Sequence, residues 1–152
     1  MTVMQRLREL RLVLPEPPTP LGAYVPAVAA GGMLFLSGML PVKDGRPAWT
    51  GRVGTELSLD EGRQAARLAA LNGLAVAQAE LSSLDRIKRV VRLTAYIAGS
   101  PDFTGHASVA DGASTLLASV FNETGGHARL AIGAYSLPAK MPVELEIILE
   151  LC

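Results

Sequence analysis

Cysteine is almost missing from this chain, since Cys152 at the C-terminal end is the single one. One cysteine cannot form a disulfide framework within the chain, which fits a reducing compartment. Histidine is also scarce: His106 and His127 are the only two, and two isolated histidines do not make a metal site. We therefore expect a cytoplasmic protein without a metal.

An excess of charge of one sign is missing as well. The chain has 14 basic and 14 acidic residues, which give a formal net charge of zero at pH 7. Nucleic-acid binders usually carry a basic excess or stripe. No apolar run approaches the roughly 18 residues that span a bilayer, and the N-terminus lacks the apolar region of a signal peptide. We expect no nucleic-acid partner and no membrane partner.

Aromatic residues make up only 5% of the chain, although apolar residues make up 49%. The core must therefore be built from alanine, valine, leucine and isoleucine. A length of 152 residues allows one domain with a core of its own. Because only 18% of the residues are charged, we expect part of the apolar surface to be buried between subunits.

Residues 1–20 differ in pattern from the rest of the chain. Apolar residues at helical spacing predict a short helix over residues 4–12. Four prolines follow between residues 15 and 20, and they enforce an extended arm. We predict an N-terminal helix and proline-rich arm over residues 1–20, followed by one folded domain over residues 21–152.

Strand and helix patterns follow one another in this domain. Ser58-Leu-Asp-Glu61 has the form of a capping box at the start of an alanine-rich helix. Alternation in the third strand places Val91 and Leu93 on one face. The predicted elements are two strands of a hairpin at 24–29 and 33–39, a helix at 59–82, a strand at 86–98, a helix at 104–121 closed by residues 122–126, and strands at 129–136 and 143–151. The order β-β-α-β-α-β-β predicts an α+β sandwich, with helices on one face of a mixed sheet and the other face uncovered.

The last two predicted strands carry one cation and one anion in apolar surroundings. Arg129 opens the first strand, and Glu144 lies near the start of the second. Because a turn containing proline joins them, we expect the two strands to be adjacent. The pair suggests a site for a small anionic molecule and a water. Two other interpretations stay open: Arg129 can be a structural ion-pair partner of Glu144 or Glu146, and Glu144 can be an ordinary surface carboxylate.

Several short segments together resemble a known family. They are Tyr24-Val-Pro, Leu36-Ser-Gly-Met-Leu-Pro41, Gly51-Arg-Val-Gly54, Asp111-Gly-Ala-Ser114, and His127-Ala-Arg-Leu-Ala-Ile-Gly133 followed by Leu137-Pro and Val143-Glu-Leu-Glu146. Across nearly all of residues 20–151 the chain resembles the Rid (reactive intermediate deaminase, YjgF-type) family. The N-terminal helix and the His-Ala-Arg triplet resemble a less characterised branch of that family.

The resemblance implies a chorismate-mutase-like fold and a homotrimer in which the three sheets form a central barrel, with three clefts between subunits. It also implies a cytoplasmic enzyme with no cofactor. The founding members of the family hydrolyse imines and enamines of small 2-amino acids to 2-oxo acids and ammonia. A small-molecule carboxylate is therefore the substrate that the resemblance implies for this chain.

The resemblance also implies roles for particular residues. Arg129 would bind the substrate carboxylate with its planar fork of donors. Glu144 would orient a water and accept its proton. The implied substrate-binding residues are Tyr24, Ser37, Gly38, Arg129 and Ala131. More ordinary interpretations stay open, since Tyr24 can be packing at an interface, Ser37 can be a simple hydrogen-bonding residue, and His127 can bond within a loop.

Three positions depart from the family pattern. Met39 stands where glutamine is usual, Asp111 where asparagine is common, and Leu130 where serine is common. Met39 would remove an amide from the rim of the cleft, and Asp111 would repel an anion if it faced the site. These changes keep a second hypothesis open, in which Arg129 captures 2-oxo acids without turnover. A third hypothesis, ribonuclease activity, is disfavoured by the zero net charge.

Overall fold

The computed structural model describes residues 1–122 and 126–152. The elements are α1 (Val3–Glu9), β1 (Ala27–Ala30), β2 (Met33–Leu36), β3 (Val42–Lys43), β4 (Arg46–Pro47), α2 (Leu59–Leu81), the 3₁₀ turn η1 (Leu84–Arg86), β5 (Ile87–Ala98), α3 (His106–Phe121), β6 (Ala128–Ala134), the 3₁₀ turn η2 (Pro138–Lys140) and β7 (Val143–Leu151). The short β3–β4 hairpin lies outside the main sheet. The predicted α+β class and the order β-β-α-β-α-β-β are confirmed.

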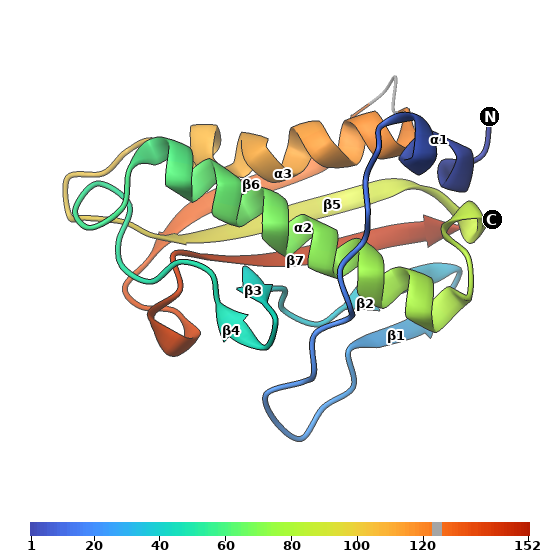
Figure 1. Ribbon diagram of the computed structural model, residues 1–152, viewed down its shortest axis with the longest axis horizontal. Helices are drawn as coiled ribbons and strands as arrows, with labels where there is room; N and C mark the ends of the chain where they lie inside the picture. Colours follow the sequence, from blue (N-terminus) through green and yellow to red (C-terminus); the bar gives the residue numbers. More distant parts are fainter. Residues whose placement is uncertain (123–125) are drawn as a thin grey trace.

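Helices α2 and α3 lie side by side over one face of the sheet (Figure 1). The capping box at the start of α2 is present, because the Ser58 hydroxyl accepts from the Glu61 amide and the Glu61 carboxylate accepts from the Ser58 amide, both at 3.1 Å. Helix α3 ends at Phe121 and is followed by the cap residue Asn122, which has a left-handed conformation. The predicted closing segment 122–126 otherwise falls largely on residues 123–125, which lie outside the described residues.

The N-terminal helix α1 is held against the helical layer. The Met4 amide donates to the Asp85 carboxylate at 2.9 Å, and the Arg6 guanidinium donates to the Ser119 carbonyl of α3 at 3.0 Å. Leu7 is buried on the side that faces the domain. In the described part of the chain, no helix combines the length and the apolar character needed to cross a bilayer.

The strands of the main sheet are ordered β1-β2-β7-β5-β6, and only β5 and β6 run parallel. The expected adjacency of the last two strands is therefore wrong, because β5 lies between β6 and β7. Strand β6 follows β5 through the crossover helix α3, which places it parallel to β5 at the edge of the sheet. Strand β7 then returns to the middle of the sheet, between β2 and β5.

A bulge changes the alternation of β5. Its pairing with β7 shifts register between Val90 and Arg92, so the extra residue moves the next side chains to the opposite faces. Val90 is fully buried beneath the helices, whereas Val91 is only partly buried. The prediction that Val91 shares the core face with Leu93 is therefore wrong. The assignment of Leu93 to that face is confirmed.

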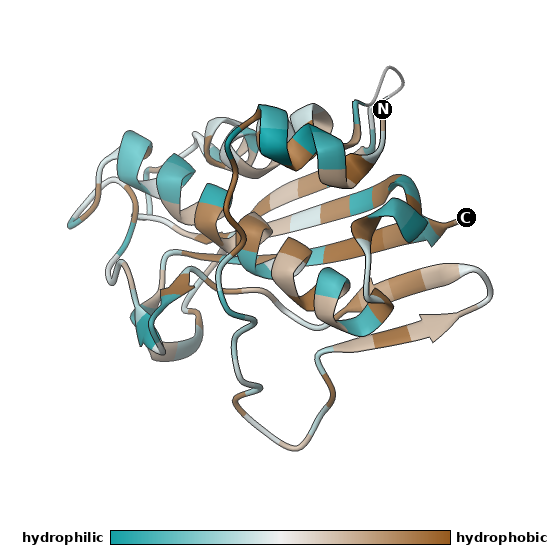
Figure 2. Cartoon of the chain, turned by 45° about the vertical axis from the view of Figure 1, so that its right-hand side comes forward, coloured by the Kyte–Doolittle hydropathy of each residue, from teal (hydrophilic) through white to brown (hydrophobic). Residues whose placement is uncertain are grey.

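The opposite face of the sheet is left uncovered by the chain. Four large apolar side chains on this face are between 39% and 52% exposed: Val28, Phe35, Leu130 and Ile132. Hydrophobic stretches run along the strands in Figure 2. Apolar side chains on this face are neighbours across β1, β2 and β7, because Val28 pairs with Phe35 and Phe35 pairs with Ile148. Leu130 on β6 is separated from them by Thr94 and Glu146. Exposed apolar side chains gathered on one face are typical of interaction surfaces and ligand-binding grooves.

We expect Gly112→Ala in α3 to destabilise the protein. A β-carbon at residue 112 would collide with the Arg63 carbonyl oxygen of α2, a backbone atom that cannot rotate away. Alanine is about 1 kcal/mol better than glycine in a helix, but overpacking costs about 1–3 kcal/mol. A lower free energy of unfolding in urea would confirm the collision. Thr115→Ala, at an exposed position of the same helix, is the control and should change stability by less than about 0.5 kcal/mol.

Candidate functional site

Arg129 points to the helix-covered side of the sheet. It pairs with Leu93 of β5, which in turn pairs with Ile147 of β7, and both of these neighbours are buried under the helices. From the edge strand the guanidinium reaches α3. Its Nη1 donates to the Asp111 carboxylate at 2.6 Å and to the Ser114 hydroxyl at 3.2 Å. The Arg129 side chain is 25% exposed, so a small molecule can reach it at the rim of the domain.

His127 completes a group of four polar residues. Its Nε2 lies 2.9 Å from the Ser114 hydroxyl oxygen. We call Asp111, Ser114, His127 and Arg129 the Arg129 cluster. Asp111 and Ser114 are three residues apart on α3 and therefore lie on one side of that helix. Two of the segments that resemble the Rid family, one on α3 and one on β6, meet in this cluster.

Glu144 belongs to the other face of the sheet. It alternates along β7 with Val143 and Leu145, which are buried beneath the helices, so its own side chain points away from them. The carboxylate is half-buried, and this burial raises its pKa above the ordinary value for glutamate. Gly38 lies against it, since a β-carbon at residue 38 would collide with the Glu144 carboxylate.

Ser37 lies next to Gly38, and Tyr24 belongs to the arm that Ser37 contacts. The Ser37 hydroxyl donates to the Val25 carbonyl at 2.6 Å, which ties the end of β2 to the arm before β1. Tyr24 precedes Val25 in this arm, is exposed, and accepts a hydrogen bond from the Leu21 amide at 3.0 Å. We call Tyr24, Ser37, Gly38 and Glu144 the Glu144 group.

The predicted site residues therefore fall into two sets within one chain. Ala131 lies on the same face of β6 as Arg129 and packs against the core, whereas Glu144 lies on the other face of the sheet. The ion pair that Arg129 makes is with Asp111, rather than with Glu144 or Glu146. One chain does not bring the proposed carboxylate-binding residue and the proposed base together.

The three departures from the family pattern have different positions. Met39 is buried, its backbone exchanges hydrogen bonds of 2.8 and 2.9 Å with Leu145, and its side chain lies close to Gly73 of α2. The expectation that Met39 lies on the rim of a cleft is therefore wrong. Leu130 is part of the uncovered face. Asp111 does lie at the site, but it pairs with the arginine.

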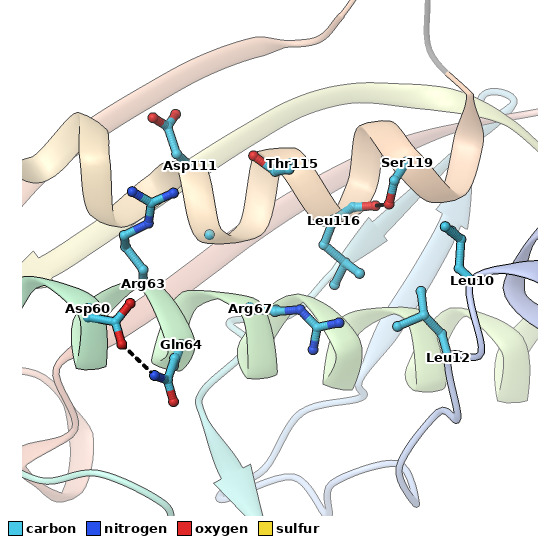
Figure 3. A pocket seen from close by; sticks show the side chains of 11 residues that line it. Leu10, Leu12, Asp60, Arg63, Gln64, Arg67, Asp111, Thr115, Leu116 and Ser119 are labelled. Carbon is cyan, nitrogen blue, oxygen red and sulfur yellow. Dashed lines mark hydrogen bonds between the residues drawn. The ribbon is translucent and has the colours of Figure 1, made fainter.

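A groove of about 370 Å³ runs along the outside of the helical layer. It is bordered by the end of α1, by α2 and by α3, and Figure 3 shows Arg63 and Arg67 extending into it from α2. Asp111 is the only residue that the groove shares with the Arg129 cluster. The substrate-binding residues expected from the sequence do not line it, so the groove and the Arg129 cluster are neighbouring but separate features.

The sequence did not predict that Asp111, Ser114 and His127 lie together beside Arg129. Each was visible in a segment that resembles the family, but no local pattern indicates that α3 and the start of β6 are in contact. The contact depends on the packing of α3 over β5 and β6. The spacing of Asp111 and Ser114 on one helical face is the signal that could have placed them together.

Glu144 should make the stability of the protein fall as pH rises. Because the pKa of this carboxyl is raised in the folded state, its full contribution is present below the ordinary carboxyl pKa and is lost as pH rises through the folded-state value. We expect Glu144→Gln to remove this loss, so that the variant gains stability relative to wild type toward pH 7. Urea unfolding at several pH values and one protein concentration measures the difference.

Glu150→Gln is the matched control for this experiment. Hydrogen bonds from Lys88 and Arg89 hold the pKa of Glu150 below its usual value, so its contribution has the opposite sign. That contribution is present above the ordinary carboxyl pKa and is lost as pH falls. An identical pH dependence in wild type and Glu144→Gln would contradict the prediction for Glu144.

Comparison with known proteins identifies the family. A family model described as "YjgF/chorismate mutase-like, putative endoribonuclease" matches residues 4–150. Protein TCP17 of Trypanosoma cruzi is 43% identical over 150 residues, which are 98% of this chain and 94% of that protein.

Two solved structures are similar over almost their whole length. The protein Atu1372 of Agrobacterium tumefaciens, described as having unknown function, is 39% identical with a TM-score of 0.89, and the match covers 99% of this chain and 92% of that one. A "putative endoribonuclease" of Shewanella oneidensis is 32% identical with a TM-score of 0.94, covering 99% and 100%. The chain therefore belongs to the YjgF/chorismate-mutase-like family, and the resemblance to Rid (YjgF-type) proteins is confirmed.

Proposed function

We propose that this protein hydrolyses reactive 2-imino acids, or their enamine tautomers, to 2-oxo acids and ammonia. The observation that carries the proposal is the free side of the Arg129 guanidinium. Among the described residues, only its Nη1 atom is used as a donor, toward Asp111 and Ser114. Nη2 and Nε remain for a carboxylate, and a guanidinium presents such donors as a planar fork.

Glu144 would orient the attacking water and accept its proton. Burial raises the pKa of Glu144, which makes the carboxylate a stronger base than an exposed glutamate. The approach of Gly38 leaves no side chain between the carboxylate and the end of β2. Tyr24 and the backbone of Ser37 and Gly38 would border the space in which the water and the substrate lie.

The proposed active site requires two protomers. Arg129 and Glu144 lie on opposite faces of the sheet within one chain, while β6 is an edge strand and the face that carries Glu144 has exposed apolar side chains. A homotrimer that buries this face would place the edge of one sheet beside the uncovered face of the next. We propose that Arg129 with Ala131 comes from one protomer, and that Glu144 with Tyr24 comes from its neighbour.

The proposed hydrolysis depends mainly on the positioning of the water and the substrate. Water attacks the imine carbon as its proton passes to Glu144, and the nitrogen receives the electrons of the C=N bond together with a proton from solvent. Glu144 releases its proton to solvent. The nitrogen of the resulting carbinolamine then takes up a second proton from solvent, the carbinolamine hydroxyl gives its proton to Glu144, and ammonia leaves as the C=O bond forms. Arg129 holds the adjacent carboxylate, which fixes the imine carbon relative to the water. Holding two reactants in line can supply several kcal/mol of a barrier, and imines hydrolyse readily once a water is placed.

A second candidate function is the capture of 2-oxo acids or other small carboxylates without turnover. The observation that favours it is the separation of Arg129 from Glu144 in the single chain, since Arg129 alone is sufficient to bind an anion. The two functions differ in their need for Glu144. Hydrolysis requires Glu144 for the rate, whereas simple binding would not require it.

Ribonuclease activity is named in the descriptions of the family and of the Shewanella protein. The present chain has a formal net charge of zero, and RNA binding depends on neutralising phosphates with basic residues. We therefore keep the hydrolysis of small imino acids as the proposed function. RNA binding measured at several salt concentrations would test the alternative.

The decay of 2-iminopropanoate, formed in situ and trapped with semicarbazide, tests the proposed activity. We expect wild-type protein to lower the amount of imine that semicarbazide traps. We expect Arg129→Ala to lower kcat/KM by about 10–100-fold, because the variant loses hydrogen bonds to a charged group. Arg63→Ala, in the separate groove, is the control and should retain full activity. No acceleration by folded wild-type protein would reject the enzyme in favour of the carboxylate binder.

Mixing two inactive variants tests the assignment of the site to two protomers. We expect Arg129→Ala and Glu144→Gln to be inactive alone, and to recover activity after they are unfolded and refolded together. In a random mixture, about a quarter of the interfaces would combine an intact Arg129 with an intact Glu144. No recovery in correctly assembled mixtures would show that both residues act from the same chain.

A further inference from the structure

We propose that the groove between α2 and α3 binds a small monocarboxylate that has an apolar body. This site does not depend on the proposed function, because the groove and the Arg129 cluster share only Asp111. Two features of the groove carry the proposal. One is a pair of arginines that have no acidic partner, and the other is a wall of leucines beside them.

The two arginines lie on one side of α2. Arg63 and Arg67 are one turn apart, and both are exposed. Among residues 1–122 and 126–152, no hydrogen bond or ion pair engages either guanidinium. Figure 3 shows Arg63 extending toward α3 and Arg67 extending toward Leu12. Like charges at this spacing repel each other, so an anion that contacts both groups is attracted by each and offsets their repulsion.

The two aspartates that line the groove are bonded to other residues. Asp111 accepts from Arg129 at 2.6 Å, and Arg129 itself lies outside the groove. Asp60 accepts from the Gln64 side chain at 2.6 Å. Asp60 also lies in the first turn of α2, where the helix dipole favours a negative charge. Neither aspartate therefore takes the place of a ligand at the two arginines of α2.

The charge balance of the groove favours a ligand with one negative charge. Two arginines and two aspartates line it. Because Arg129 compensates Asp111 from outside, one positive charge is left in excess. A phosphate with two negative charges would bring one charge too many close to the aspartates. A carboxylate balances the excess, and its two oxygens match the planar donors of a guanidinium.

Leucines form the apolar wall of the groove. The chain leaves α1 through a turn in which the Leu12 amide donates to the Leu7 carbonyl at 2.9 Å, and Arg11 has a left-handed conformation. This turn brings Leu10 and Leu12 to the groove, which Leu116 of α3 also lines. Leu10 is 36% exposed, so contact with an apolar ligand would remove part of its surface from water.

The size of the groove suits a small molecule. Its volume of about 370 Å³ is near the lower end of the range for small-molecule sites, about 300–1,000 Å³. In the proposed complex the carboxylate lies between Arg63 and Arg67, and the apolar body lies against Leu10 and Leu12. An acyl chain of medium length has both of these parts, and octanoate is therefore a suitable probe.

Titration of the assembled protein with octanoate, followed by calorimetry and by NMR of the backbone amides, tests the site. We expect saturable shifts at residues of the groove, among them Thr115 and Leu116. We expect Arg63→Gln and Arg67→Gln each to raise Kd by about tenfold, because each variant loses a hydrogen bond to a charged group. Arg46→Gln is the control, since Arg46 is exposed and lies outside this groove, and it should leave Kd unchanged.

Three further probes separate the contribution of charge from that of apolar contact. Butanoate keeps the carboxylate but has a much shorter chain, and we expect it to bind at least about tenfold more weakly, since each methylene removed from water favours binding. Octylammonium has the same chain with the opposite charge, and we expect it not to bind. We expect inorganic phosphate to bind more weakly than octanoate.

Several results would overturn the groove site. They are an absence of octanoate binding, shifts confined to the Arg129 cluster and β6, or an unchanged Kd in both Arg63→Gln and Arg67→Gln. Tighter binding of phosphate than of octanoate would overturn the choice of a monocarboxylate. Hydrolysis of 2-iminopropanoate is measured in parallel, and its absence in wild type would overturn the proposed function while leaving the groove site intact.

Discussion

The one-sided cover of the sheet by α2 and α3 determines where the polar side chains of this protein can act. Because side chains alternate along a strand, each residue either faces the helices or faces away from them. Arg129 is on the first side and Glu144 is on the second. The same cover leaves exposed apolar side chains on the face that carries Glu144. The arrangement of the helices therefore separates the two charged residues within a chain, and the proposed function requires a second chain to bring them together.

The Arg129 cluster illustrates how a charged residue can remain partly buried and still be available. Asp111 neutralises the guanidinium, and Ser114 and His127 complete its surroundings. A buried cation without such partners would be costly. The ion pair with Asp111 nevertheless uses only one nitrogen of the guanidinium. Under the proposed function, an incoming carboxylate would therefore add to the cluster without first having to break it.

Much of the fold could be predicted from the sequence because the relevant signals are local. The capping box at Ser58, the alternation in the strands and the order of the elements all depend on residues close to one another in the chain. The position of β6 depends on a crossover through α3 instead, and the bulge near Val90 depends on pairing with β7. These are tertiary effects, and they are the places where the predictions failed.

The candidate site likewise has some features that the sequence predicts and others that depend on tertiary contacts. Arg129 and Glu144 could be selected from their apolar surroundings and from the resemblance to Rid proteins, but the face that each occupies could not. Met39 shows the difference most clearly: its position beside Ser37 and Gly38 suggested the rim of a cleft, whereas pairing with Leu145 turns it into the core. The partnership of Ser114 with His127 likewise needs the packing of a helix on an edge strand.

Gly112 links the helical layer to this chemistry. It lies directly after Asp111 and two residues before Ser114, and it packs against the backbone of Arg63 in α2. Any side chain there must push α3 outward and carry both residues away from Arg129. In a genetic screen for activity, substitutions at Gly112 would consequently score like substitutions of a reacting group, although the glycine touches no substrate. A map of tolerated substitutions would thus extend the apparent active site into the interface between the two helices.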